Sequence, residues 1–366
     1  MKTNKVFKNI LSLLTLGLVV FSCNKPSEGP KTEEEAIQNT IANIKRIVFT
    51  KAKNSTTATN PNTATPAYAA LFVKKTPAVT YADLDTEFPA VIQGDTVIKV
   101  TVPFDKTLNI STAATLTATI TLNKKPGENV YLGDKKLTDS TAPFDYPIST
   151  KLVHSELIKS TGGVSQVLEI KRKDKDGNVL IKKSFKVVFV HNAPSNLCTI
   201  GQNDFKFTVD TTHNIVGSFR TTSPAREAGT IVKAHYVAPN NNDKDGTEAK
   251  PFEFQLRTKK NTGTGDDSTM GELEQTANAT TYFKADALKL PDGAFIEIGT
   301  STDACTTSEC NNVNPITGII TGGTANATTT DLKGFTSSIS YKFTVVAQDG
   351  TTKKYYKLTI NANAPS

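Results

Sequence analysis

The side chains of this chain that are best suited to catalysis, metal binding or disulfide formation are its four cysteines and four histidines. The histidines, His154, His191, His213 and His235, are scattered, and no two of them have the spacing of an HExxH zinc helix. The chain also lacks a GxSxG nucleophile motif, a P-loop and a GxGxxG loop after a strand. No pair of carboxylates stands out for glycoside hydrolysis. The sequence therefore indicates no catalytic residues, no cofactor and no enzyme activity.

One acidic loop has part of the spacing of a calcium site. Asn241, Asp243, Asp245 and Gly246 fall at positions that a calcium-binding loop uses, but its twelfth position is Phe252 rather than a glutamate. Because the ligand set is incomplete, we interpret the segment as a polar turn. No metal site is predicted anywhere in the chain.

The first cysteine, Cys23, stands directly after an apolar run. Three lysines among the first eight residues precede this run, which extends from Ile10 to Phe21 and is too short to span a bilayer. Residues 1–22 are therefore predicted to be a secretory signal peptide. The stretch Val20-Phe21-Ser22-Cys23 resembles the lipobox of bacterial lipoproteins, which implies cleavage before Cys23 and attachment of lipid to it. The alternative is an ordinary signal peptide followed by a chance cysteine.

The lipobox resemblance places the protein at the cell envelope, in contact with a membrane through the lipid on Cys23. The outer membrane is the expected location, and the sequence does not distinguish its surface-exposed face from its periplasmic face. Residues 23–41 combine proline, glycine and charge with few apolar residues, which is typical of a flexible tether. The run Glu33-Glu34-Glu35 is either a surface-export signal of the kind associated with Bacteroidetes lipoproteins or the first turn of a helix capped by Thr32.

The other three cysteines are compatible with export. Cys305 and Cys310 bracket a short loop and form a candidate disulfide in an oxidising compartment. Pairing of Cys198 with either of them stays open, as do free thiols.

Alternating apolar residues predict an all-β chain. In residues 114–122, Leu116, Ala118, Ile120 and Leu122 alternate strictly with threonines, which is the pattern of a half-buried strand. Residues 97–102, 341–347 and 355–360 alternate in the same way.

An internal repeat divides the chain. The segments KDGNVLIKKSFKVVF (175–189) and QDGTTKKYYKLTI (348–360) align on their Lys-Lys pairs, so that Phe185, Val187 and Phe189 fall opposite Tyr356, Leu358 and Ile360. Alternation places Tyr341 and Tyr356 in the core rather than in a sugar-binding platform. Residues 96–103 similarly resemble residues 230–239. The repeat predicts two domains, residues 42–192 and 193–366.

These motifs resemble a known family. An opening strand, an IxVxVP strand and the closing hairpin YKFTVVAQDGTTKKYYKLTI (341–360) are similar to the Ig-like repeat domains of Bacteroidetes lipoproteins of unknown function. The resemblance implies two tandem Ig-like β-sandwich domains after the signal peptide and tether. It covers the strands, leaves residues 240–334 without a counterpart, and implies no catalytic residues.

The net charge of the chain limits the classes of partner that it is expected to bind. The full chain has a net charge of +7, and removing residues 1–22 takes away three lysines and no acid, which leaves +4. This mild and dispersed excess predicts no nucleic-acid partner. Four Asp-Ser/Thr triplets resemble Bacteroidetes-type O-glycosylation sites, with the candidate hydroxyls on Thr96, Ser140, Thr211 and Ser268.

Two functional hypotheses follow from the sequence. The first is a lipid-anchored binding or adhesion module, whose long second-domain loops, including Cys305 and Cys310, contact a glycan or protein ligand. The alternative is a structural spacer or accessory subunit of an outer-membrane complex.

Overall fold

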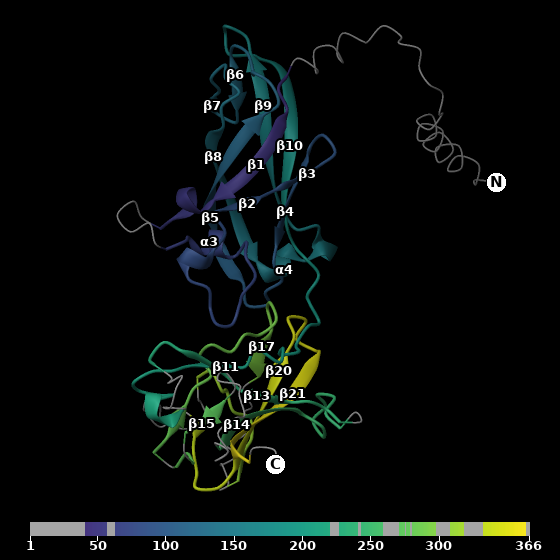
Figure 1. Ribbon diagram of the computed structural model, residues 1–366. Helices are drawn as coiled ribbons and strands as arrows, with labels where there is room; N and C mark the ends of the chain where they lie inside the picture. The colour runs from purple at the N-terminus through teal and green to yellow at the C-terminus, as the bar shows by residue number, and fades with distance from the viewer. Residues whose placement is uncertain are drawn as a thin grey trace, which may run out of the picture. The chain divides into compact units, whose positions relative to one another are not determined.

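A computed structural model gives the fold of the protein (Figure 1). It describes residues 41–56, 63–219, 227–240, 243–258, 271–274, 276–278, 280–297, 308–317 and 332–363. The signal peptide, Cys23 and the tether up to residue 40 lie outside the described residues. Within the described ranges no helix combines the length and the hydropathy that a membrane span requires.

The described chain consists almost entirely of strands, as the alternation predicts. Its short helical turns, as far as they are described, are η1 (Lys51–Asn54), α3 (Pro66–Ala69), η2 (Tyr81–Asp83), α4 (His154–Leu157), η3 (Lys159–Thr161) and η4 (Val216–Ser218). The strands before residue 192 are β1 (Ile44–Thr50), β2 (Glu87–Pro89), β3 (Val91–Gln93), β4 (Val97–Val102), β5 (Asn109–Leu122), β6 (Val130–Leu132), β7 (Lys135–Lys136), β8 (Phe144–Val153), β9 (Val164–Lys173) and β10 (Val179–His191). The predicted all-β fold class is confirmed.

The later strands are shorter on average. They are β11 (Lys206–Thr208), β12 (Ile231–Lys233), β13 (His235–Val237), β14 (Phe252–Thr258), β15 (Glu272–Leu273), β16 (Tyr282–Phe283), β17 (Phe295–Glu297), β18 (Glu309–Cys310), β19 (Leu332–Lys333), β20 (Ile339–Val346) and β21 (Lys353–Ala362).

The chain forms two compact units. One comprises Met1–Asn43, Leu122–Thr141 and Leu168–Ser184, and the other comprises Ile44–Thr121, Ala142–Val167 and Phe185–Ser366. The predicted domain boundary between residues 192 and 193 stays a prediction.

In the smaller unit, β6 pairs with β9 in antiparallel register, with Val130 opposite Arg172 and Leu132 opposite Ile170. Val130, Leu132 and Ile170 are buried and form its apolar centre.

In the larger unit, strands before residue 192 form a sandwich. One sheet has the order β2-β1-β5-β8, and the other contains β3, β4 and β10 in that order. The inner faces pack through buried side chains, and the ring centroids of Phe49 in β1 and Phe189 in β10 are 6.4 Å apart. The predicted alternation in β5 is confirmed, because Leu116, Ala118 and Ile120 are fully buried.

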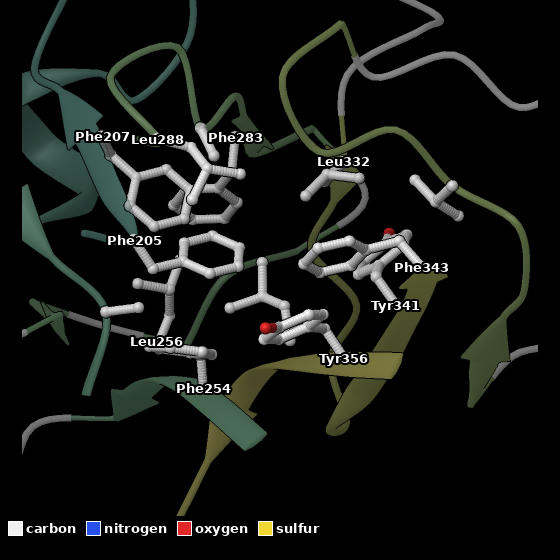
Figure 2. Close-up of a cluster of buried hydrophobic side chains, with 14 of the residues drawn as sticks. Phe205, Phe207, Phe254, Leu256, Phe283, Leu288, Leu332, Tyr341, Phe343 and Tyr356 are labelled. Atoms are coloured by element: carbon white, nitrogen blue, oxygen red, sulfur yellow. The ribbon is translucent and has the colours of Figure 1, made fainter. Parts of the chain in front are cut away.

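The strands after residue 200 enclose an aromatic core. The main sheet has the order β13-β14-β21-β20-β17, with β15 beside β14 and β18 beside β20. Figure 2 shows the rings of Phe205, Phe254, Phe343 and Tyr356 gathered in this core. The rings of Phe343 and Tyr356 stack with centroids 5.3 Å apart, and those of Phe205 and Phe254 are 4.9 Å apart. Burial of such side chains contributes about 1.5–3 kcal/mol each.

The internal repeat is visible in strand order. β10 is flanked by β4, parallel to it, and by β9, while β21 is flanked by β14, also parallel, and by β20. An antiparallel strand lies beyond each parallel partner, β3 in one case and β13 in the other. The predicted equivalence of the inner faces is confirmed, because Phe185, Val187, Phe189, Tyr356, Leu358 and Ile360 are all buried.

One predicted correspondence within the repeat is wrong. The sequence aligns residues 96–103 with residues 230–239. In the structure, however, the strand that occupies the place of β4, parallel to the last strand of the repeat, is β14. Ile98 lies opposite Val187, as Phe254 lies opposite Leu358. β14 belongs to the stretch for which the sequence offered no counterpart, because its IxVxVP-like motif is replaced by FEFQLRT.

Candidate functional site

A groove of about 620 Å³ lies on the outer face of β4 and β10. Its floor comes from the side chains of these strands that alternate with the buried ones, and its walls come from residues 158–162 and from the segment after β10. The lining residues are Gln93, Val97, Lys99, Thr101, Phe104, Ile158, Lys159, Gly162, Val188, Val190, His191, Asn192, Ala193 and Pro194. Most of these side chains are apolar.

Strand register explains why these residues meet. β4 and β10 run parallel, with Lys99 opposite Val188 and Thr101 opposite Val190. Side chains directly opposite each other project from the same face of a sheet, so these four residues form one continuous surface. In β10, the half-buried Val188 and the buried Val190 alternate with Val187 and Phe189 of the inner face, so that both faces of the strand are apolar.

Sequence reasoning missed this groove. The run VVFVH (187–191) was the available signal, because it has apolar residues on both faces of the strand. In a strand with one face in water, apolar residues normally alternate with polar ones. Its partners on β3, β4 and residues 158–162 are far away in sequence, so no local pattern reveals them.

The groove is cationic at two points. Lys99 is half-buried and Lys159 is exposed. Neither ammonium has an ion-pair partner among the described residues, and none of the fourteen lining residues is acidic. The groove therefore combines an apolar floor with uncompensated positive charge.

Two histidines pack beside Phe104, and one of them, His191, lines the groove together with Phe104. The ring centroids of His154 and His191 are 5.2 Å apart, and the Phe104 ring lies 5.2 Å from His154 and 5.5 Å from His191. Nδ1 of His191 lies 3.3 Å from the carbonyl oxygen of Val102, which can only accept, so Nδ1 carries the proton. Nε2 of His191 and Nδ1 of His154 are buried and have no hydrogen-bond partner in the part of the chain that the structure describes. Burial, and secondarily the neighbouring His154, lower the pKa of His191.

The cysteines divide into two classes. Cys310 is buried and disulfide-bonded, whereas Cys198 is a free, buried thiol whose pKa is raised by burial. Pairing between Cys198 and Cys310, one of the open alternatives, therefore does not occur in this structure. The predicted partner Cys305 and the lipid-attachment residue Cys23 lie outside the described residues.

The candidate glycosylation residues are dispersed. Thr96 is exposed in the turn before β4, and Ser140 is half-exposed with its N–H donating to the carbonyl of Thr138. Thr211 is exposed, and its hydroxyl donates to the carboxylate of Asp210 at 3.1 Å. Ser268 lies outside the described residues. The structure brings none of the three described hydroxyls into the groove.

The two tyrosines assigned to the core by alternation lie there. Tyr341 and Tyr356 are 2% and 0% exposed. The Tyr341 hydroxyl donates to the carbonyl of Lys333 at 2.6 Å, and burial raises its pKa to about 12. The Tyr356 hydroxyl donates to the carbonyl of Cys198 and accepts from the N–H of Ile200, and burial raises its pKa further. Neither ring is available to stack against a ligand.

The acidic loop at residues 243–246 has a self-contained hydrogen-bond pattern. The carboxylate of Asp245 accepts from the N–H and hydroxyl of Thr247, which lowers its pKa, and Lys354 donates to the Asp245 carbonyl. Asn241 lies outside the described residues. No three His, Cys, Asp or Glu side chains of the described ranges are grouped as a metal site.

Comparisons with known proteins show only weak likeness. No protein-family model matches the chain, and no curated protein matches it. Among solved structures, the "Sialic acid binding region of Streptococcus Sanguinis SK1 adhesin bound to 3'sLn" is similar over 75% of this chain and 78% of that chain, with 9% identity and a TM-score of 0.17. At that TM-score the likeness supports no statement about the fold or ligand of this chain.

Proposed function

We propose that this protein is a lipid-anchored, non-catalytic binding module of the cell envelope, and that the groove on β4 and β10 takes up an apolar small molecule. The observation that carries the proposal is the groove itself. Its volume of about 620 Å³ lies in the range of roughly 300–1,000 Å³ that is typical of small-molecule sites, and it has their mostly apolar lining. Its floor belongs to two paired strands, which hold the lining side chains in fixed positions.

The anchoring part of the proposal rests on the sequence. The lipobox-like Val20-Phe21-Ser22-Cys23 supports lipid attachment at Cys23, and residues 23–41 supply a tether. Several acyl chains on one residue give stable anchoring, because each buried methylene contributes about 0.8 kcal/mol. The second-domain loops expected to contact a ligand lie largely outside the described residues, so the groove is the better-supported contact site.

A tryptophan reporter tests binding in the groove. The chain contains no tryptophan, so a single Gln93→Trp substitution at the exposed edge of the groove gives an emission signal from this place alone. The full chain is placed in nanodiscs of zwitterionic lipid and titrated with brominated dodecanol, whose bromine quenches tryptophan on close approach. We expect quenching that saturates.

The matched control is Lys151→Trp on β8, an exposed position in the other sheet. Quenching there should rise without saturation, because only probe dissolved in the lipid reaches it. If the two reporters behave alike, the groove does not bind apolar molecules, and the alternative of a spacer or accessory subunit becomes the better account.

A further inference from the structure

We propose that the groove selects anionic amphiphiles, specifically alkyl carboxylates, and that Lys99 and Lys159 bind the carboxylate. This inference rests on the proposed binding function and assigns its ligand class. It starts from an imbalance of charge: the lining includes two lysines and no acid. A ligand with a single negative charge would supply the missing partner, whereas a neutral or cationic ligand would leave the ammonium groups uncompensated.

The position of Lys99 suits this role. It lies on β4, opposite Val188 of β10 in the floor and opposite Val91 of β3 on the other side of the strand. The methylene stem of a lysine in such surroundings packs along the apolar surface and extends its ammonium to the rim. Lys159 comes from the wall, so the two lysines approach the groove from different segments.

The remaining lining argues against a sugar. Apart from the lysines and His191, the polar side chains are Gln93, Thr101 and Asn192. The Asn192 amide oxygen already accepts the N–H of Phe104 at 2.8 Å. A saccharide exposes many hydroxyls that need hydrogen-bond partners, and burying unpartnered hydroxyls is costly. An alkyl chain needs none, and its single charged head matches the two lysines.

The Gln93→Trp reporter distinguishes these ligands. Brominated dodecanoate and brominated dodecanol have the same chain and differ in the head group. We expect dodecanoate to reach half-saturation at a concentration about fivefold lower than dodecanol. A partly exposed ion pair between the carboxylate and a lysine strengthens binding by about this factor. Lys99→Gln should reduce this ratio to near one, and Lys159→Gln should reduce it in part.

Three further results separate the two proposals. Lys151→Gln, an exposed lysine of β8, should leave the ratio unchanged and thereby exclude a general charge effect. Saturable quenching by both probes with equal affinity, or with a ratio insensitive to Lys99→Gln, would overturn the carboxylate inference and leave the binding function intact. Absence of saturable quenching by either probe would overturn both. Because the dodecanol signal is measured in every variant, a misfolded variant is recognised by loss of that signal as well.

Discussion

Single buried polar side chains tie distant segments of the chain together. Asn54 donates to the carbonyls of Thr50 and Thr117 and accepts from the Thr117 N–H, which joins η1 to β5. Asn214 in the same way donates to the carbonyls of Thr208 and Lys284. Leaving a buried backbone group without its partner costs about 1–3 kcal/mol. These residues are therefore structural positions that a hydrophobicity pattern does not reveal.

Tyr356 gives the clearest test at this scale. Tyr356→Phe keeps the stacked ring but removes the acceptor of the Ile200 N–H and the donor to the Cys198 carbonyl. We expect the free energy of unfolding to fall by about 1–3 kcal/mol. Urea unfolding followed by circular dichroism measures it, and Tyr355→Phe on the outer phase of β21 is the control, with a change of less than about 0.5 kcal/mol. Equal effects of both variants would contradict the assigned hydrogen bonds.

The histidine pair predicts a pH dependence. Burial lowers the pKa of His191 from its ordinary value of 6.5; His154 disfavours the protonated form and Asp105 favours it. The unfolded chain therefore takes up this proton at a higher pH than the folded chain. The stability contributed by neutral His191 is complete above pH 6.5 and is lost as the pH falls through the lowered folded pKa.

Urea unfolding at a series of pH values checks this expectation. His191→Asn retains a side-chain N–H for the Val102 carbonyl and removes the titrating group, so it should flatten the decline in stability below pH 6.5. His213→Asn, at a half-exposed position outside the cluster, should leave the decline unchanged. If the stability of His191→Asn falls below pH 6.5 as steeply as that of the wild type, groups other than His191 cause the fall.

At the scale of elements, turns and bulges set where the repeated hairpins begin and end. The β20–β21 turn is held by Asp349, whose carboxylate accepts from the Thr352 hydroxyl and from the N–H groups of Thr351 and Thr352; these bonds lower its pKa to about 2. The turn after β9 uses Asp174 in the same way, with bonds from Asp176 and Asn178. The two hairpins therefore resemble each other in the aspartate that holds the turn as well as in their buried inner faces.

Asn361 marks a bulge near the end of β21. The parallel pairing with β14 passes from Ile360 directly to Ala362, and Asn361 has φ +58°. Its amide exchanges two hydrogen bonds of 2.8 Å with the backbone of Ala277 and also donates to the Phe335 carbonyl. A positive φ costs a residue with a Cβ about 1–2 kcal/mol, whereas glycine adopts it freely.

Two substitutions at Asn361 separate backbone from side-chain effects. Both variants lose the side-chain hydrogen bonds, but Asn361→Ala keeps a Cβ at the positive φ, whereas Asn361→Gly is free of that strain. We expect both to be destabilising, with Asn361→Ala worse by about 1 kcal/mol. Thermal or urea unfolding gives the order. Equal stability of the two variants would show that the backbone at this bulge relaxes.

The elements also show what a sequence can predict. The inner faces of β5, β10 and β21 were predictable, because alternation depends only on neighbours along the chain. The pairing of β14 with β21 was not, because parallel register depends on contacts about a hundred residues apart and FEFQLRT has lost the motif of β4. The groove could not be predicted for the same reason: its two lysines line one groove only when β4, β10 and residues 158–162 come together.

The proposed function combines a lipid anchor at Cys23 with a binding groove on β4 and β10. Protease treatment of intact cells tests the anchor and the face of the membrane. If the protein is surface-exposed, residues 193–366 should be cleaved in intact cells carrying the wild type, whereas Cys23→Ala should not reach the surface. Protection until the cells are permeabilised would place the protein on the periplasmic side.

Binding of an alkyl carboxylate in the groove is tested by mapping where a photoreactive ligand attaches to the full chain in membranes. A diazirine-bearing dodecanoate is cross-linked by light, and the modified peptides are identified by mass spectrometry. We expect adducts concentrated on residues 97–104 and 188–194, suppressed by excess dodecanoate and by Thr101→Trp, which fills the floor of the groove. Adducts spread over the chain, or adducts insensitive to both the competitor and Thr101→Trp, would contradict binding in the groove.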